Sequence, residues 1–420
     1  MQRRDFLMGL GTTGALAAIG ARPLVAAAEG AGAAGAATEA LAAEPLAPAS
    51  RRAMAELLAL LAEIEQRMFA PEWRVHTAQD VVDGQRLVWN LLAAATDLYF
   101  EADPERPRFV PMVSPTRKFL GDNPDARYYL APLRADRSYR IRGRVASAVY
   151  TSFTFQAGDE NGIAGRIFAT RNDREFDVAR DGSYELRLGP DASGRNAVRL
   201  EPGAVSVTTR HYFENEVSAQ LDPTLEIPLS IEPTVDPGPP SAPDDAEMAR
   251  RIRLATGFVR QSTLGIPPRD PKQQPGWVST VPNQLGTPSA SGKGEGDKTA
   301  WGAVDNSYTS GTYVLRPDEA LVIEGRLPRC TFANVVLWDR WMMSYDYRYR
   351  RISLNRRQMK LGEGGRYRIV VAHRDPGVPN WLDAEGRTSG TIFWRFLEPE
   401  EAPERPRTKV IPVASLAKAG

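Results

Sequence analysis

Apolar positions near the start of the chain recur at helical spacing. In residues 51–69 and 78–100 an apolar side chain returns every three or four positions, which predicts two helices. Ser50 stands where the first of these helices would have its N-cap. The same spacing in residues 245–264 predicts a third helix.

From about residue 108 the pattern changes to short runs in which apolar and polar residues alternate, separated by Pro, Asp and Gly. Strand candidates cover residues 138–145, 148–156, 175–178, 184–188 and 204–212, and a second β-rich stretch covers residues 312–397. Short strands separated by turns are typical of an antiparallel sandwich or jelly roll. We therefore expect a mainly β protein with flanking helices, built from two related jelly-roll-like antiparallel β-sandwich units.

The two β-rich stretches resemble one another in sequence. The segment SYRIRGRVASAVYTSFTF, from Ser138, matches ALVIEGRLPRCTFANVVLW, from Ala320. Matched positions are Gly143 with Gly325, Tyr184 with Tyr367, Arg210 with Arg395, and residues 129–132 with 313–317. The order is kept and the offset is nearly constant, which predicts an internal duplication.

Five segments are distinctive: NPDARYYLAPL, SYRIRG, LRPDEALVIEGR, LWDRW and HRDPGVPNWLD. With these motifs the chain resembles the long, signal-bearing members of a bacterial family, the domain of unknown function numbered 1214. Residues 312–397 carry the better match, and the earlier half matches more loosely. The resemblance implies a jelly-roll-like β fold with flanking helices, and it implies no established activity.

The composition shifts along the chain predict seven segments. They are a signal peptide (1–28), a disordered linker (29–50), a helical region (51–104), a first β-sandwich unit (105–234), a Pro-rich connector with a helix and a long loop (235–311), a second β-sandwich unit (312–397) and an extended tail (398–420).

The first segment is typical of a twin-arginine signal peptide. Arg3-Arg4 is followed by Phe6-Leu7, an apolar run rich in Gly and Ala, and an Ala-x-Ala option at residues 26–28. We expect recognition by the twin-arginine export machinery, a periplasmic or secreted location in a bacterium, and no stable membrane span after cleavage. An uncleaved anchor is the alternative.

Charge and composition narrow the function classes. Lys+Arg (53) and Asp+Glu (52) nearly cancel, so the chain lacks the concentrated positive charge of a nucleic-acid-binding protein. It has one cysteine and three histidines, with no closely spaced histidine pair, so we expect no metal site and no cofactor. Nucleophile-elbow, phosphate-loop and dinucleotide motifs are missing from the sequence.

Residues 337–383 concentrate aromatic, Arg and Asp side chains. The predicted ligand-binding residues are Trp338, Arg340, Trp341, Tyr345, Arg348, Arg374, Asn380 and Trp381. Aromatic rings stack on the apolar faces of sugars, and Arg and Asp exchange paired hydrogen bonds with hydroxyls. In an extended strand Tyr345, Tyr347 and Tyr349 would share one face. The same composition could instead build a core edge of Arg–Asp and Arg–Tyr contacts.

His373 and Asp375 are the candidate catalytic residues. His373 precedes an Asp-Pro-Gly turn at the end of a predicted strand, where it could act as a general base or hold the turn through a backbone carbonyl. A carboxylate pair is a further option for glycoside cleavage, with salt bridges to Arg as the alternative; the candidates are Asp339, Asp346, Asp375 and Asp383.

The leading hypothesis is an exported protein that binds a carbohydrate or other hydroxyl-rich ligand in its second β unit. One alternative is a hydrolase or lyase acting on a glycan, with His373 or an Asp as acid/base. The other is a structural or assembly protein of the cell envelope, in which the aromatic stretch is core or interface.

Overall fold

A computed structural model describes residues 48–73, 75–158, 162–266, 270, 272, 274–289 and 302–418. The predicted signal peptide and residues 29–47 of the predicted linker lie outside this description. None of the helices within it combines the length and the hydropathy required to cross a membrane.

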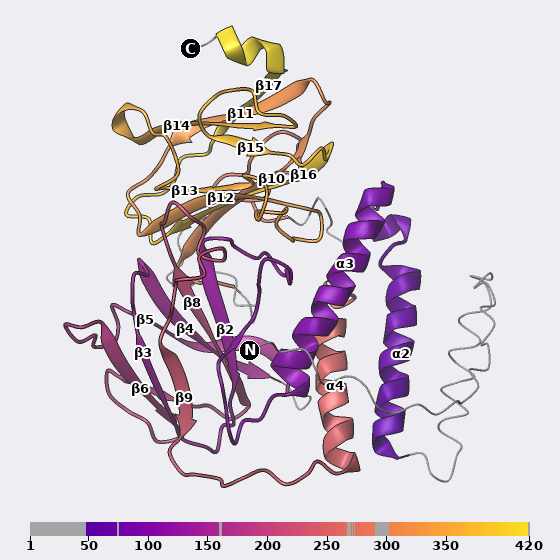
Figure 1. The fold of residues 1–420 in the computed structure, drawn as a ribbon, viewed down its shortest axis with the longest axis vertical. Helices are drawn as coiled ribbons and strands as arrows, with labels where there is room; N and C mark the ends of the chain where they lie inside the picture. The colour runs from indigo at the N-terminus through magenta and orange to yellow at the C-terminus, as the bar shows by residue number, and fades with distance from the viewer. Residues whose placement is uncertain are drawn as a thin grey trace, which may run out of the picture.

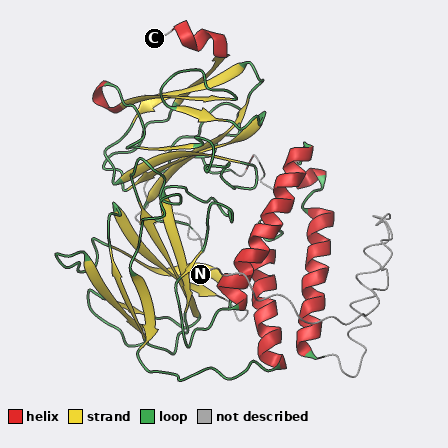
Figure 2. Ribbon diagram, in the orientation of Figure 1, coloured by secondary structure: helices red, strands yellow, loops and turns green. Residues whose placement is uncertain are grey.

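Two β units are stacked along the long axis, and three helices lie side by side along one flank (Figure 1, Figure 2). The first unit contains β1 (Val110–Pro111), β2 (Ala126–Pro132), β3 (Tyr139–Arg144), β4 (Tyr150–Gly158), β5 (Ala164–Asn172), β6 (Ser183–Gly189), β7 (Ala197–Arg199), β8 (Ala204–Tyr212) and β9 (Leu229–Pro233). Its two sheets have the strand orders β1-β2-β8-β4-β5 and β7-β6-β3-β9.

The second unit contains β10 (Asn306–Val314), β11 (Glu319–Arg326), β12 (Phe332–Trp338), β13 (Ser353–Asn355), β14 (Arg366–Ala372), β15 (Trp381–Asp383), β16 (Ser389–Leu397) and β17 (Arg407–Pro412). Its sheets have the orders β10-β16-β12-β13 and β15-β14-β11-β17. The strands β2, β8 and β4 of the first unit thus correspond to β10, β16 and β12 of the second. In both units the other sheet also carries one parallel pair at the same place, β6 with β7 and β14 with β15. The expected class is confirmed: the fold is mainly β, with two β-sandwich-like units and flanking helices.

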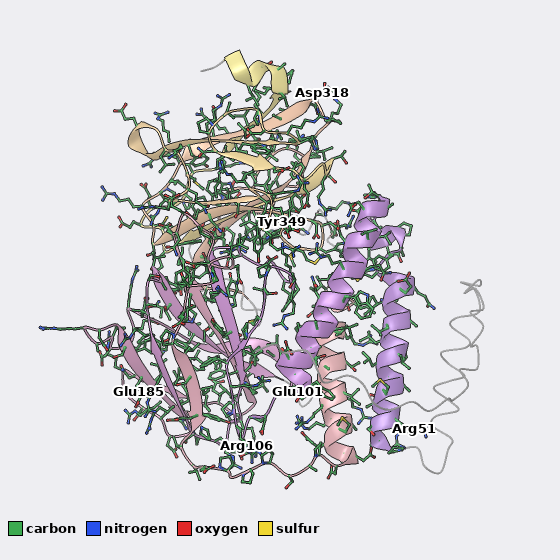
Figure 3. All side chains as sticks on the ribbon, in the orientation of Figure 1. Arg51, Glu101, Arg106, Glu185, Asp318 and Tyr349 are labelled. Carbon is green, nitrogen blue, oxygen red and sulfur yellow. The ribbon has the colours of Figure 1, made fainter. Side chains whose placement is uncertain are left out.

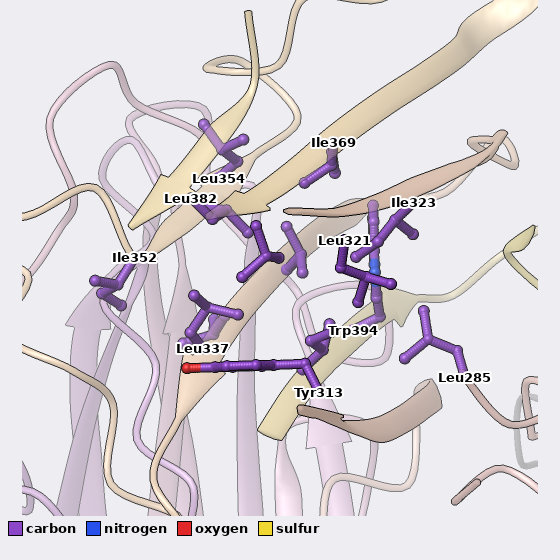
Figure 4. Close-up of a cluster of buried hydrophobic side chains, with 14 of the residues drawn as sticks. Leu285, Tyr313, Leu321, Ile323, Leu337, Ile352, Leu354, Ile369, Leu382 and Trp394 are labelled. Atoms are coloured by element: carbon purple, nitrogen blue, oxygen red, sulfur yellow. The ribbon is translucent and has the colours of Figure 1, made fainter. Parts of the chain in front are cut away.

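Alternation along the strands builds the core of each sandwich. In β16, Ile392, Trp394 and Phe396 point inward, as expected for a strand in which every second side chain faces the same way. They join Tyr313 and aliphatic side chains from both sheets of the second unit (Figure 4). A separate cluster of Tyr, Phe, Leu and Val fills the first unit.

The helices are α2 (Ala49–Arg67), α3 (Ala78–Ala95), which continues as a π-helical turn over Thr96–Phe100, and α4 (Asp245–Ser262). The predicted N-cap at Ser50 was wrong, because Pro48 occupies that position and offers no side-chain acceptor. Ser50 lies in the first turn, where its amide donates to the Asp245 carboxylate of α4 over 3.0 Å. The two helices are also joined by the ion pairs Arg253–Glu56 (2.9 Å) and Arg260–Glu63 (2.7 Å).

Several boundaries differ from the prediction. Residues 175–178 are turn, bend and irregular backbone rather than a strand, although Phe176 packs in the core, and the neighbouring strand β5 was not predicted. The second unit begins earlier than predicted, with β10, in which small polar residues obscure the alternation of apolar and polar positions. It also ends later, because the predicted tail supplies the edge strand β17. The matched pair of residues 129 and 313 is also out of register. Tyr128 faces Arg210 and Tyr308 faces Arg395, so the tyrosines opposite the two matched arginines are Tyr128 and Tyr308.

The matched glycines Gly143 and Gly325 provide a test of this packing. A Cβ at Gly143 would lie 2.2 Å from the Tyr184 hydroxyl, and one at Gly325 would lie 2.4 Å from the Tyr367 hydroxyl. We expect Gly143→Ala and Gly325→Ala each to lower the free energy of unfolding by roughly 1–3 kcal/mol, because the Tyr ring must move. Gly165→Ala in β5 is the matched control, since no atom lies within 4 Å of the added methyl. Equal unfolding curves in urea for Gly143→Ala and Gly165→Ala would contradict this packing.

Candidate functional site

Trp338 lies in the core of the molecule rather than on a binding surface. Its side chain is 3% exposed, and its ring stacks on Phe393 with the ring centroids 4.2 Å apart. The indole Nε1 donates to the backbone carbonyl of Asp122 over 3.0 Å. A sugar therefore has no free face of this ring on which to stack.

Tyr345 is buried in the same way. Its hydroxyl lies 2.7 Å from the hydroxyl of Tyr313, and the Arg387 guanidinium lies over its ring, 4.8 Å from the centroid. Tyr347 is also buried, whereas Tyr349 is exposed. The three tyrosines do not share a face, because this segment is a loop and not a strand.

Arg340 and Trp341 join the second β unit to the helices. The Trp341 indole donates to the carbonyl of Asp80 over 2.8 Å, and its ring meets the Phe69 ring edge-on. Arg340 donates to the carbonyl of Trp73 and lies 3.6 Å from the Asp80 carboxylate. Both side chains therefore have packing partners on α3 or just before it.

Asn380 and Trp381 also have structural partners. Asn380 adopts a positive φ of 57°, and its side-chain amide exchanges two hydrogen bonds with the backbone of Lys360, over 2.7 and 2.8 Å. The Trp381 indole donates to the carbonyl of Ala372 over 3.1 Å, within a small apolar cluster on the outer face of its sheet.

The candidate catalytic residues are placed at the turn after β14. His373 Nε2 lies 3.3 Å from the carbonyl of Leu315, which matches the alternative in which this histidine contacts a backbone carbonyl. The Asp375 carboxylate accepts from the amide of Gly377 over 2.8 Å, and Arg374 is exposed beside it. His211 lies in the core of the first unit, where burial lowers its pKa to about 3. Over the described ranges, no group of three or more His, Cys, Asp or Glu could hold a metal ion.

Part of the predicted stretch does reach solvent. Tyr349, labelled in Figure 3, is 81% exposed. The Arg348 guanidinium lies 5.2 Å from the centroid of its ring. Asp346 holds Arg348 through two hydrogen bonds of 2.9 and 2.7 Å, which keep the pKa of Asp346 below its usual range. Arg350 binds Asp383 over 2.8 Å beside them. We call these five residues the Tyr349 platform.

A buried carboxylate network lies next to this platform. Arg387 binds Asp83 of α3 and, over 3.0 Å, Glu385. Asp339 accepts from the amides of Trp341 and Met343 over 2.9 and 3.0 Å. Burial raises the pKa of Asp339 to about 7, and the nearby charge of Asp83 acts in the same direction. Asp339, Asp346 and Asp383 were predicted as possible acid/base groups. Asp346 and Asp383 bind arginines, as the salt-bridge alternative expects, and Asp339 binds backbone amides.

Sequence reasoning missed the segment of residues 112–125, which we call the docking loop. It leaves β1 of the first unit and enters the second unit. The buried ammonium of Lys118 donates to the carbonyls of Ser344 (3.0 Å) and Tyr345 (2.7 Å) and lies 4.1 Å from the centroid of the Tyr347 ring. Burial lowers the pKa of Lys118.

Two carboxylates complete the docking loop. Asp122 accepts from the amide and hydroxyl of Ser344, over 2.7 and 2.5 Å. Asp125 accepts from the side-chain amides of Asn334 and Asn355, each over 3.0 Å. Burial raises the pKa of both carboxyls. No periodicity predicts such residues; the signals in the sequence are polar residues between two short strands and the motif NPDARYYLAPL, which includes Asp125.

A solved structure with a similar fold is known. The chain resembles the crystal structure of an uncharacterized protein from Burkholderia cenocepacia, with 27% identity and a TM-score of 0.73 over 90% of this chain and 99% of that one. It also matches the VPA0106 protein from Vibrio parahaemolyticus, with 14% identity and a TM-score of 0.45 over 78% of this chain and 98% of that one. No family model and no curated protein matches the chain.

The raised pKa of Asp339 predicts a pH dependence of stability. Its folded-state pKa lies above its unfolded value, so its contribution is complete below about pH 4 and is lost as the pH rises through 7. Asp339→Asn stays neutral and can keep both amide hydrogen bonds. We expect its free energy of unfolding, relative to the unmodified chain, to increase by roughly 1–4 kcal/mol between pH 5 and pH 8.

Urea unfolding at several pH values measures this difference. Asp346→Asn is the control, because its carboxyl has a lowered pKa and loses its contribution only as the pH falls toward that value. The difference in the free energy of unfolding between Asp346→Asn and the unmodified chain should stay constant between pH 5 and 8. A constant difference for Asp339→Asn as well would show that Asp339 is ionised throughout.

Proposed function

We propose that this chain is an exported protein with two duplicated β units that binds an oligosaccharide or other hydroxyl-rich ligand at the Tyr349 platform. The observation that carries the proposal is the Tyr349 ring, which is 81% exposed beside an Arg348 side chain fixed by Asp346. An exposed ring beside fixed hydrogen-bonding side chains offers a sugar both a face for stacking and polar partners.

The chemistry of the platform suits a sugar. A flat ring can cover the apolar face of a pyranose, and burying that face and the ring stabilises the complex. Arg348 with Asp346, and Arg350 with Asp383, place hydrogen-bond donors beside acceptors. Neighbouring hydroxyls of a sugar also donate and accept side by side, so such pairs can bind both at once.

The platform is supported from below. Arg350 also approaches Glu385 (3.6 Å), which binds Arg387, and Arg387 binds Asp83 of α3. Ordered side chains lose less conformational entropy when a ligand binds, which favours affinity. The charges nearly balance over this network, which fits a neutral ligand better than a strongly charged one.

Export and duplication are part of the same proposal. Export is supported by the Arg3-Arg4 motif and the apolar run that follows it. Duplication is supported by the shared strand orders and by equal registers, since Gly143 faces Tyr184 just as Gly325 faces Tyr367.

One alternative is favoured by a specific observation. Helix α3 exposes Trp89 (72%) and Val82 (60%), which are seven positions apart and so lie on one face. Exposed Trp is common at the centre of protein interfaces, so this face, together with the burial of Trp338, favours an assembly protein. For the enzyme alternative, the partners of His373 and Asp375 supply no comparable support.

A pair of substitutions tests the platform. Tyr349→Ala removes the ring and should weaken binding to a responsive oligosaccharide about tenfold, the equivalent of ~1.4 kcal/mol. Tyr349→Phe keeps the ring and should bind within about twofold of the unmodified chain. Isothermal titration against a panel of oligosaccharides measures both.

Folding is not expected to interfere, because the side chain is exposed; unfolding curves check this point. Equal affinity of Tyr349→Ala and Tyr349→Phe would exclude stacking on this ring. No binding by the unmodified chain across the panel would favour the assembly alternative, which sedimentation of Trp89→Ala then tests.

A further inference from the structure

A second group of polar side chains lies between the two β units, away from the Tyr349 platform. We call it the inter-unit centre, and it consists of Tyr128, Arg210 and Tyr212 of the first unit with Asn306, Tyr308 and Arg395 of the second. Tyr128 faces Arg210 across β2 and β8, and Tyr308 faces Arg395 across β10 and β16. Each unit thus supplies one Tyr–Arg pair at an equivalent position.

The two pairs form one electrostatic group. Burial raises the pKa of both Tyr128 and Tyr308, and both Arg395 and Arg210 act against that rise at each tyrosine. The rings of Tyr128 and Tyr212 meet edge-on, with centroids 6.4 Å apart. The Asn306 amide, from the second unit, lies 3.4 Å from the Tyr212 hydroxyl.

Arg395 is buried with part of its hydrogen-bonding capacity unused. It is 5% exposed, and its guanidinium lies next to the stacked rings of Trp338 and Phe393, at 5.0 and 4.8 Å from their centroids. Nη2 donates to the carbonyl of Gly121 over 2.7 Å, while the buried Nη1 has no partner in the described part of the chain. A buried charged donor without a partner is costly, so its presence needs a reason.

Two carboxylates influenced by the charge of Arg395 do not supply that partner. Asp122 and Asp125 are close enough to feel the charge of Arg395, but their oxygens bind Ser344 and the amides of Asn334 and Asn355. Their hydrogen bonds belong to the docking loop, and among the described residues the guanidinium Nη1 remains without an acceptor.

A small cavity opens beside this group. It is lined by Tyr150, Ser152, Thr154, Thr170, Arg210, Tyr212, residues 303–306 and Leu397, and its volume of about 10 Å³ suits one water-sized group. Arg210 donates to Thr154 over 2.6 Å at its wall. The Asp305 carboxylate is occupied by the Tyr150 hydroxyl.

Asn306 is the second group with unused capacity. Its Oδ1 is buried without a partner among the described residues, and the contact of its Nδ2 with Tyr212 is long. If the amide turned by 180°, the Tyr212 hydroxyl could donate to Oδ1, and Nδ2 would become a free donor. The centre would then present N–H donors from Arg395 and Asn306, close to a second guanidinium.

We propose that the inter-unit centre binds a monatomic anion, chloride under ordinary conditions, between Arg395 and Asn306 and close to Arg210. Two guanidinium groups in a water-poor environment attract a negative ion strongly, and the cavity lined by Arg210 and Asn306 has room for one water-sized group only. The ion links the two β units, because its donors come from β16 and β10 and the adjacent positive charge comes from β8.

Two measurements on the mature chain test the proposal. In sodium chloride, compared with sodium gluconate at equal ionic strength, Tm should rise and then saturate as chloride increases. In crystals grown with sodium bromide, an anomalous peak should lie within hydrogen-bond distance of Arg395 Nη1.

Asn306→Asp places a carboxylate where the anion would bind and should abolish the chloride effect on Tm and the bromide peak. Arg395→Gln should do the same. If Arg395→Gln fails to fold, Asn306→Asp and the bromide crystals still decide the question.

A Tm that depends only on ionic strength, together with a water and no bromide at Arg395, would overturn the proposal. So would an unchanged chloride effect in Asn306→Asp. Tyr349→Ala should keep the full chloride effect, so failure at the platform and failure at the centre are distinguishable.

Discussion

The arrangement of the molecule depends on the docking loop that the first β unit inserts into the second. Lys118, Asp122 and Asp125 are buried at this junction, and each has partners from the second unit. Burying a charge costs several kcal/mol unless hydrogen bonds replace the lost water. The two units can therefore meet favourably in one relative position, in which all three groups are satisfied.

The helices are fixed to the same junction. Asn90 of α3 donates to the carbonyl of Lys118 over 2.9 Å, and Asp83 of the same helix binds Arg387 of the second unit. Trp341 adds its contact with Asp80. The first unit, the second unit and the helices thus converge on the segment that follows β12, which explains why aromatic and charged residues are so dense there.

The sequence predicted the fold better than the site, and the reason is physical. Periodicity reports which face of a regular element is buried, so α2, α3, α4 and the strands β3, β4, β6 and β8 were found close to their observed bounds. The segment of residues 339–352 is irregular, and alternation has no meaning there. Tyr345 and Tyr349 both have aromatic and charged neighbours in the sequence, yet Tyr345 is buried and Tyr349 is exposed to solvent. Arg210 and Arg395 were matched in the sequence comparison. That both lie between the two units could not be predicted, because it depends on how the units pack.

The docking loop also has a consequence for the order of folding. Its partners lie far along the chain: Ser344 follows Asp122 by 222 positions, and Asn355 follows Asp125 by 230. Strand β17, which pairs with β11, is synthesised later still. A chain leaving the ribosome must therefore keep a charged loop in water until nearly all of the second unit has emerged, and contacts between such distant segments form slowly. The first unit can gather its apolar core early, whereas its final position is set among the last events of folding.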